Sequence, residues 1–147
     1  MGFKRTRHAV YDASYHLVWC TKYRKPILKY KLGKVCRAIF YKISRDNDWD
    51  VIELEMGVDH VHIFISFPPK YSISKVVGIL KSKSGAKIFR ENPWIRNFYW
   101  GHEFWEDGYF ARTVGDNVTK EIISKYVRRH KDGKDVEISS EEQLELF

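Results

Sequence analysis

The segment of residues 59–66 constrains the fold more than any other part of the chain. It is short and rich in β-branched and aromatic residues, and two prolines follow it, which predicts a strand over residues 60–67. Successive side chains of a strand point to opposite faces of the sheet. His60 and His62 therefore lie side by side on one face. The apolar side chains share the other face, which can be buried: Val61, Ile63, Ile65 and Phe67.

The two histidines admit two interpretations. Two imidazoles held on one strand at positions i and i+2 form a good bidentate site for a divalent metal. Alternatively, they are polar residues on the solvated face of a half-buried strand. The residue before the pair is equally ambiguous, because the carboxylate of Asp59 either orients a ligand histidine or only makes the turn.

Periodic patterns on both sides of this strand predict the remaining elements. Further strands are expected at 10–20, 49–56 and 109–114, and helices at 28–45, from Ser72 or Ser74 to about 89, and at 118–130. The order β-α-β-β-α-β followed by a helix is that of an α+β, ferredoxin-like fold, with an antiparallel sheet and two helices on one face. If the apolar face of strand 60–67 packs on those helices, the histidines lie on the opposite, open face. The last helix or a partner chain has room there.

The distribution of charge favours a polyanionic partner. The chain has 147 residues, a net charge of +7 and 16% aromatic residues. Residues 132–147 form an acidic tail with six acids and one lysine, a net charge of −5, so the domain of residues 1–131 carries +12. A basic, aromatic-rich domain is typical of nucleic-acid-binding proteins. A purely structural role is the interpretation that this charge favours least.

Cysteine usage and hydropathy indicate a cytoplasmic protein. Cys20 and Cys36 form no CxxC spacing and are expected to be reduced thiols. The sequence opens with no pattern typical of a signal peptide, and no stretch approaches the roughly 18 apolar residues of a membrane span. We therefore expect no contact with a membrane.

The last predicted helix carries a residue suited to covalent chemistry. Tyr126 and His130 are four residues apart and so share a face of that helix. A tyrosine hydroxyl can attack a phosphodiester, and it benefits from a metal that polarises the phosphate. His130 would be a third metal ligand beside His60 and His62. The alternatives are a packing role for Tyr126 and, for His130, a cation favoured at a helix C-terminus.

Several ordered blocks resemble the single-tyrosine transposases of the insertion-sequence 200/605 family. The HUH motif of that family, a hydrophobic residue between two histidines, is similar to His60-Val61-His62 with Asp59 before it. The resemblance covers about residues 15–130. Its other blocks are Tyr15-His16-Leu17-Val18-Trp19, Thr21-Lys22-Tyr23-Arg24, Pro68-Pro69-Lys70-Tyr71-Ser72-Ile73-Ser74-Lys75, Leu80-Lys81-Ser82-Lys83-Ser84, Phe104-Trp105, Tyr109-Phe110 and Thr113-Val114-Gly115.

The resemblance implies a mechanism. Such prokaryotic enzymes bind hairpins in single-stranded DNA, and their tyrosine attacks a phosphodiester, retains the 5′ phosphate and frees a 3′ hydroxyl. The 3′ hydroxyl of another strand then attacks the phosphotyrosine. Carried over, His60 and His62 are ligands of Mg²⁺ or Mn²⁺ and Tyr126 is the nucleophile, in a homodimer whose active sites are completed in trans. Many members have glutamine where this chain has His130, a change that would shift metal preference toward softer ions.

DNA contacts are expected from basic and aromatic side chains. The candidates for phosphate contacts are Lys4, Arg5, Arg7, Lys22, Arg24, Lys25, Lys81 and Lys83, and those for base stacking are Tyr23 and the aromatics of 94–105. Within that aromatic segment, Phe104 and Trp105 are expected in the core. Three alternatives remain: a domesticated relative that cleaves hairpins of host repeats, a replication-type nicking nuclease, and a non-catalytic RRM-like binder. The last predicts aromatics on the face where the histidines lie.

Overall fold

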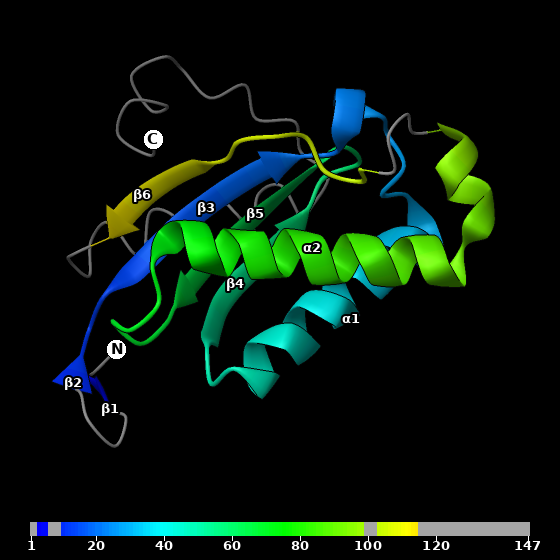
Figure 1. Cartoon of the computed structure of the whole chain (residues 1–147). Coiled ribbons are helices and arrows are strands. Elements are labelled where there is room, and N and C mark those ends of the chain that lie inside the picture. The colour runs from blue at the N-terminus through cyan, green and yellow to red at the C-terminus, as the bar shows by residue number, and fades with distance from the viewer. Residues whose placement is uncertain (1–2, 6–9, 99–102, 115–147) are drawn as a thin grey trace, which may run out of the picture.

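A four-stranded antiparallel sheet forms the centre of the molecule. The computed structural model describes residues 3–5, 10–98 and 103–114. The strands are β3 (Ser14–Cys20), β4 (Asp50–Met56), β5 (His60–Ser66) and β6 (Phe110–Val114), in the spatial order β4-β5-β3-β6. Two helices, α1 (Tyr30–Asp46) and α2 (Ile73–Glu91), lie on the same side of this sheet (Figure 1). This arrangement confirms the predicted α+β, ferredoxin-like fold.

The remaining elements are short. β1 (Lys4–Arg5) pairs with β2 (Val10–Tyr11) in a separate two-stranded sheet, and the 3₁₀ helices η1 (Lys22–Arg24) and η2 (Pro93–Phe98) lie in connections. The single strand predicted over 10–20 was therefore wrong at its start, because its first two residues pair with β1 and not with the main sheet. The predicted helix 118–130 and the acidic tail lie outside the described residues. None of the described helices is long and apolar enough to cross a membrane.

The serine before α2 explains where that helix begins. Ser72 Oγ accepts a hydrogen bond from the backbone N–H of Lys75 at 3.1 Å. This bond satisfies one of the donors that the first turn of a helix leaves unpaired. Of the two serines predicted as the cap, Ser72 therefore takes that role.

The core lies between the sheet and the two helices. Val61, Ile63 and Ile65 are fully buried in it, as the alternation of β5 predicts. Its aromatic centre includes Trp19, whose ring meets those of Phe40 and Trp105 edge-on at centroid distances of 5.7 and 6.1 Å. The core position expected of Trp105 is thus confirmed.

A buried thiol on α1 provides a test of this core. Cys36 is fully buried, and burial raises the pKa of its thiol. We expect iodoacetamide at about pH 8 to alkylate Cys36 at least about a thousandfold more slowly in the native protein than in urea. Peptide mass spectrometry measures both rates, with the half-buried Cys20 as the internal comparison. Equal native rates for the two cysteines would contradict this packing.

Candidate active site

Strand β5 places two histidines on the face of the sheet away from the helices. It lies between β3 and β4 and is hydrogen-bonded to both. The rings of His60 and His62 have centroids 4.9 Å apart and planes at 82°. His62 is 4% exposed, whereas His60 lies at the edge of the face with 22% of its side chain exposed. The alternation of the strand therefore brings the predicted pair together.

Each ring of this pair has its Nδ1 atom beside a neighbouring side chain. Asp59 Oδ1 lies 2.7 Å from His60 Nδ1, and His16 Nε2 lies 3.3 Å from His62 Nδ1. A histidine held through Nδ1 in this way would ligate a metal through Nε2, and its neighbour fixes the orientation of the ring. The donor set fits a divalent cation. The contact with His60 also supports the orienting role for Asp59.

Asp59 also joins the site to the loop that follows β3. Its Oδ2 accepts a hydrogen bond from Arg24 Nε at 3.3 Å. Burial raises the pKa of the Asp59 carboxyl, but the hydrogen bonds and charges of His60 and Arg24 outweigh it, so the pKa lies below its ordinary value. Asp59 is therefore a carboxylate at neutral pH and accepts from both neighbours.

A glycine makes room for the ring of His60. A Cβ atom added at Gly57 would lie 2.2 Å from His60 Cε1 and 2.6 Å from each ring nitrogen. The backbone N–H of Gly57 donates to the carbonyl oxygen of His60 at 2.8 Å, which holds the two residues together. Sequence analysis assigned no role in the site to Gly57, because the spacing of residues carries no sign of this contact.

Sequence analysis also assigned no role to His16 or Glu55. His16, from β3, is fully buried and contacts His62, and Glu55 of β4 stands opposite His62 in the strand register. The signal in the sequence that could have identified His16 was its position as a polar residue inside the largely apolar strand β3. The register between strands far apart in sequence does not follow from such a pattern.

The centre of the histidine face is buried, and the expectation that the last helix or a partner chain lies on it stays a prediction. The exposed fractions of His16, His62 and Phe64 are 0, 4 and 1%. An RRM-like binder stacks bases on exposed aromatics of its sheet. Phe64, the aromatic residue of β5 on this face, is too buried for that role.

The remaining predicted members of the site lie outside the described residues. These are Tyr126, His130 and Arg7, whose roles stay predictions. Within residues 3–5, 10–98 and 103–114, no group of three or more histidine, cysteine, aspartate or glutamate side chains is arranged to hold a metal. The role of His60 and His62 as metal ligands therefore also stays a prediction.

The described candidates for DNA contacts lie in three separate places. Lys4 and Arg5 lie on β1, Lys22, Tyr23, Arg24 and Lys25 in the loop after β3, and Lys81 and Lys83 on α2. Lys4 forms an ion pair with Asp50, and Lys22 forms one with Glu103 at 3.0 Å. The structure does not gather these cations into one patch. The loop of residues 22–25 is the group that contacts the histidine site, through Arg24 and Asp59.

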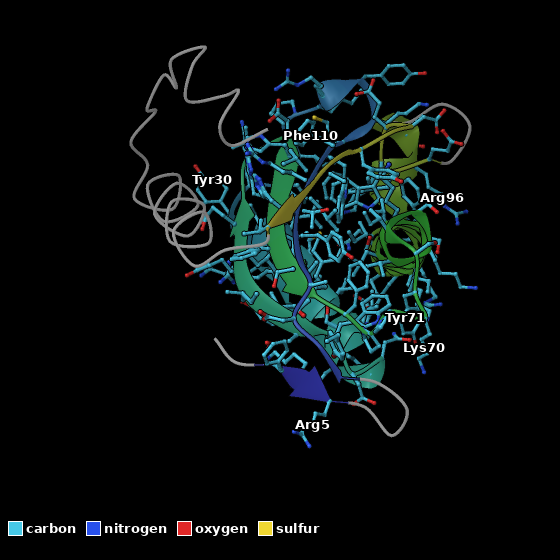
Figure 2. All side chains as sticks on the ribbon, turned by 90° about the vertical axis from the view of Figure 1, so that its left-hand side faces the viewer. Arg5, Tyr30, Lys70, Tyr71, Arg96 and Phe110 are labelled. Atoms are coloured by element: carbon cyan, nitrogen blue, oxygen red, sulfur yellow. The ribbon has the colours of Figure 1, made fainter. Side chains whose placement is uncertain are left out.

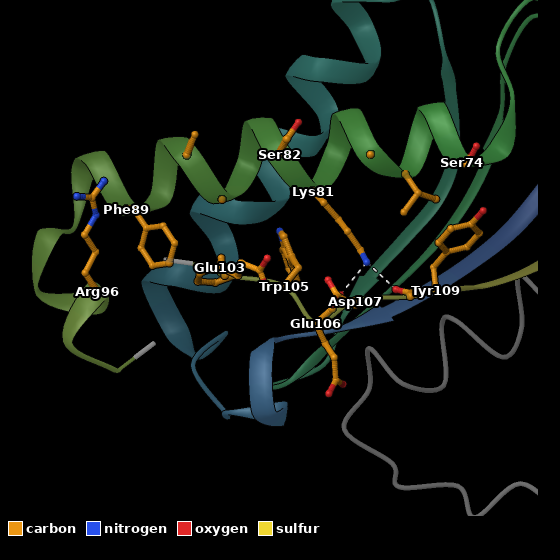
Figure 3. A pocket seen from close by; sticks show the side chains of 16 residues that line it. Ser74, Lys81, Ser82, Phe89, Arg96, Glu103, Trp105, Glu106, Asp107 and Tyr109 are labelled. Atoms are coloured by element: carbon orange, nitrogen blue, oxygen red, sulfur yellow. Dashed lines mark hydrogen bonds between the residues drawn. The ribbon is translucent and has the colours of Figure 1, made fainter. Parts of the chain in front are cut away.

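Lys81 borders a groove on the helical side of the molecule. The groove, of about 640 Å³, lies between α2 and the segment 103–109 (Figure 3). Lys81 Nζ donates to the carbonyl oxygens of Glu106 and Gly108 at 2.8 and 2.6 Å. Burial lowers the pKa of Lys81, and the surrounding carboxylates, Asp107 foremost, act in the opposite direction. Because these carboxylates would repel a phosphate, the arrangement favours a structural role for Lys81.

The two histidines of the HUH motif lie on the face of a ferredoxin-like sheet opposite its helices, and each has a neighbouring side chain at Nδ1. This is the arrangement expected of a single-tyrosine transposase, and comparison with known proteins agrees. A family model described as "Transposase IS200 like" matches residues 9–130. The ISDra2 transposase TnpA of Deinococcus radiodurans is 34% identical over 132 residues, which span 90% of this chain and 94% of that protein. The transposase for insertion sequence element IS200 of Salmonella typhimurium is 30% identical over 125 residues, 85% of this chain and 81% of that protein.

Solved structures show the same fold. A crystallised protein of Deinococcus radiodurans R1 assigned as a transposase superposes with a TM-score of 0.69 and 30% identity, over 86% of this chain and 96% of that one. A REP-associated tyrosine transposase bound to a REP hairpin shares the fold at 12% identity, with a TM-score of 0.61 over 88% of this chain and 74% of that one. The chain belongs to the IS200-like transposase family and is a DNA-processing enzyme of that family.

Proposed function

We propose that this transposase cleaves and rejoins single-stranded DNA through a phosphotyrosine at Tyr126, beside a divalent metal held by His60 and His62. The observation that carries the proposal is the pair of adjacent imidazoles, each with a neighbour at Nδ1. Membership of the family supports the assignment to DNA strand transfer.

The proposed reaction conserves phosphoester bonds. Tyr126 Oη attacks the scissile phosphorus, a new O–P bond forms, and the bond from phosphorus to the 3′ oxygen breaks. The 5′ phosphate stays on Tyr126, and the leaving oxygen takes a proton to become a 3′ hydroxyl. A 3′ hydroxyl of another strand then attacks the same phosphorus and releases the tyrosine. One bond forms for each that breaks, so joining needs no ATP.

The chain's own residues prepare the metal site. Bound Mg²⁺ or Mn²⁺ would polarise the scissile phosphate and stabilise charge on the leaving oxygen. His60 and His62 supply two nitrogen ligands, held by Asp59 and His16, and His130 is the proposed third. An imidazole at position 130, instead of an amide, favours Mn²⁺ over Mg²⁺.

The proposed substrate is a hairpin in single-stranded DNA, bound by a homodimer. The basic loop of residues 22–25, in contact with Asp59, supports an entry point for DNA beside the histidines. A REP hairpin is what the structurally similar tyrosine transposase binds. Tyr126 lies on the predicted helix 118–130, whereas the histidines lie on β5. Either subunit of a dimer is therefore able to supply the tyrosine to a given pair of histidines. We therefore propose active sites completed in trans.

Covalent trapping tests the proposal. Labelled hairpin oligonucleotides from the DNA flanking the gene are incubated with the protein and Mg²⁺, Mn²⁺ or EDTA, then separated on a denaturing gel. We expect a denaturant-resistant adduct that needs metal, and peptide mass spectrometry should place the nucleotide on Tyr126. Binding without an adduct, for every hairpin and both metals, would favour a non-catalytic binding module. An adduct on another residue would refute the role of Tyr126.

A further inference from the structure

We propose that Tyr30 and Trp94 form a stacking platform for unpaired bases of the DNA strand that reaches the histidine site. This inference rests on the proposed function, because single-stranded DNA is the occupant it names. The platform borders a groove of about 510 Å³, which is also lined by Ile27, Lys25, Lys29 and Lys31.

The exposure of the two aromatic side chains is the first observation. Tyr30 is 91% exposed and Trp94 is 55% exposed, whereas the tryptophans Trp19, Trp49 and Trp105 are buried in the core. Such rings contribute little to the packing of the fold while they present a large apolar surface to water. A flat aromatic surface in a groove is the feature that single-strand binders use to stack bases.

Backbone strain in the same segment is the second observation. Tyr30 has a φ of 50°, and Tyr23 and Arg24 have φ values of 57° and 52°. Residues with a Cβ atom adopt this left-handed conformation at an energetic cost, and glycine would remove that cost. Strain retained by three exposed aromatic and basic residues of one segment is typical of a functional segment.

The segment before Tyr30 is fastened to the histidine site. The backbone N–H and the hydroxyl of Thr21 both donate to the carbonyl oxygen of Asp59, at 2.9 and 3.2 Å. At the other end, the N–H of Leu28 donates to the carbonyl oxygen of Val58 at 2.9 Å. Figure 2 shows Tyr30 on the side of the sheet away from α2. The histidines lie on that side as well, because the alternate residues of β5 are buried in the core with the helices. The segment that leads to Tyr30 is therefore fastened at both ends to the two residues that precede His60.

The charges around the groove identify the occupant. Lys25, Lys29 and Lys31 line it, and they complement the phosphates of a nucleic-acid backbone. In a base-paired stem the faces of the bases are already stacked, whereas the bases of a single-stranded tail are available to aromatic rings. We therefore assign the groove to the single strand next to the hairpin and not to the hairpin stem.

Binding measured in EDTA separates this platform from the chemistry. Fluorescence anisotropy would compare a hairpin that carries a single-stranded tail with the same hairpin without the tail. We expect the double variant Tyr30→Ala/Trp94→Ala to bind the tailed hairpin about tenfold more weakly than the wild type. Both proteins should bind the tailless hairpin equally, and abasic sites in the tail should remove the difference between them.

Matched controls keep the outcome clear. Tyr30→Phe retains the ring and should bind as the wild type does. Tyr41→Ala removes an exposed tyrosine from another part of α1, beside Arg37, and should cause no loss. An unchanged affinity of the double variant, or an equal loss with the tailless hairpin, would overturn the proposal. A double variant that only loses dimerisation in sedimentation would also overturn it, since the occupant would then be a second copy of the chain.

The failure of this inference is distinguishable from failure of the proposed function. If the wild type forms the Tyr126 adduct but the platform variants bind normally, only the platform is wrong. If no adduct forms, but the double variant loses affinity only for the hairpin with a tail, the platform is supported and the covalent mechanism fails.

Discussion

Alanine in place of Gly57 is expected to lower the rate of metal-dependent adduct formation about a hundredfold. The new Cβ atom would lie 2.2 Å from His60 Cε1, so the ring must rotate away or the turn must open. The hydrogen bond from the N–H of Gly57 to the carbonyl oxygen of His60 opposes opening of the turn. Because Gly57 has no left-handed φ, its backbone accepts alanine, and the effect arises from the displaced imidazole.

A second glycine provides the control. Gly78 lies exposed on α2, and an added Cβ would meet no atom within 4 Å. Gly78→Ala should retain wild-type activity and gain about 1 kcal/mol of stability from the higher helix propensity of alanine. Adduct rates on gels, Mn²⁺ affinity by electron paramagnetic resonance and unfolding followed by circular dichroism would compare the two variants. A wild-type adduct rate in Gly57→Ala would show that the turn does not position His60.

Alanine in place of Trp105 is expected to lower the free energy of unfolding by about 4 kcal/mol. The side chain is 5% exposed, stacks on Phe40 at a centroid distance of 5.9 Å and donates from Nε1 to Ser84 Oγ at 2.8 Å. Its removal leaves a cavity between the sheet and α2. Urea unfolding followed by circular dichroism would measure the loss.

Two further tryptophan variants separate packing from hydrogen bonding. Trp105→Phe keeps most of the ring but loses the bond to Ser84, and should cost about 1–2 kcal/mol. Trp94→Ala removes a half-exposed ring and should change stability by no more than about 0.5 kcal/mol. Similar losses for Trp105→Ala and Trp94→Ala would contradict the assignment of Trp105 to the core.

The sequence predicts the histidine pair because the relevant geometry is local. Two residues that are i and i+2 in a strand share a face whatever the rest of the chain does. The support of His62 by His16 depends on the register between β3 and β5, which are separated in sequence by a helix and β4. The contact of Gly57 with His60 depends on the rotamer of one side chain. Neither the strand register nor this rotamer can be predicted from the spacing of apolar and polar residues in the sequence.

Counting charges predicts a basic domain but not which cations are available to DNA. Lys4 and Lys22 pair with Asp50 and Glu103, which lie 46 and 81 residues away in sequence. The fold brings these partners together, and the residues near each lysine in the sequence do not predict them. Tyr30 was not predicted as a DNA contact for a similar reason, since its unusual exposure and backbone conformation appear only in the structure.

The position of β5 inside the sheet bears on how the enzyme would use its metal. A strand with a partner on both sides and an apolar face in the core holds its shape without any ion. Small zinc-binding domains are different, since their fold is lost when a chelator strips the metal away. Here a chelator would switch the proposed chemistry off and fresh metal would restore it, with no refolding between. The ion would then behave as an exchangeable reagent. The concentration of metal in the cell would determine when strands are cut, because the protein is folded with or without the ion.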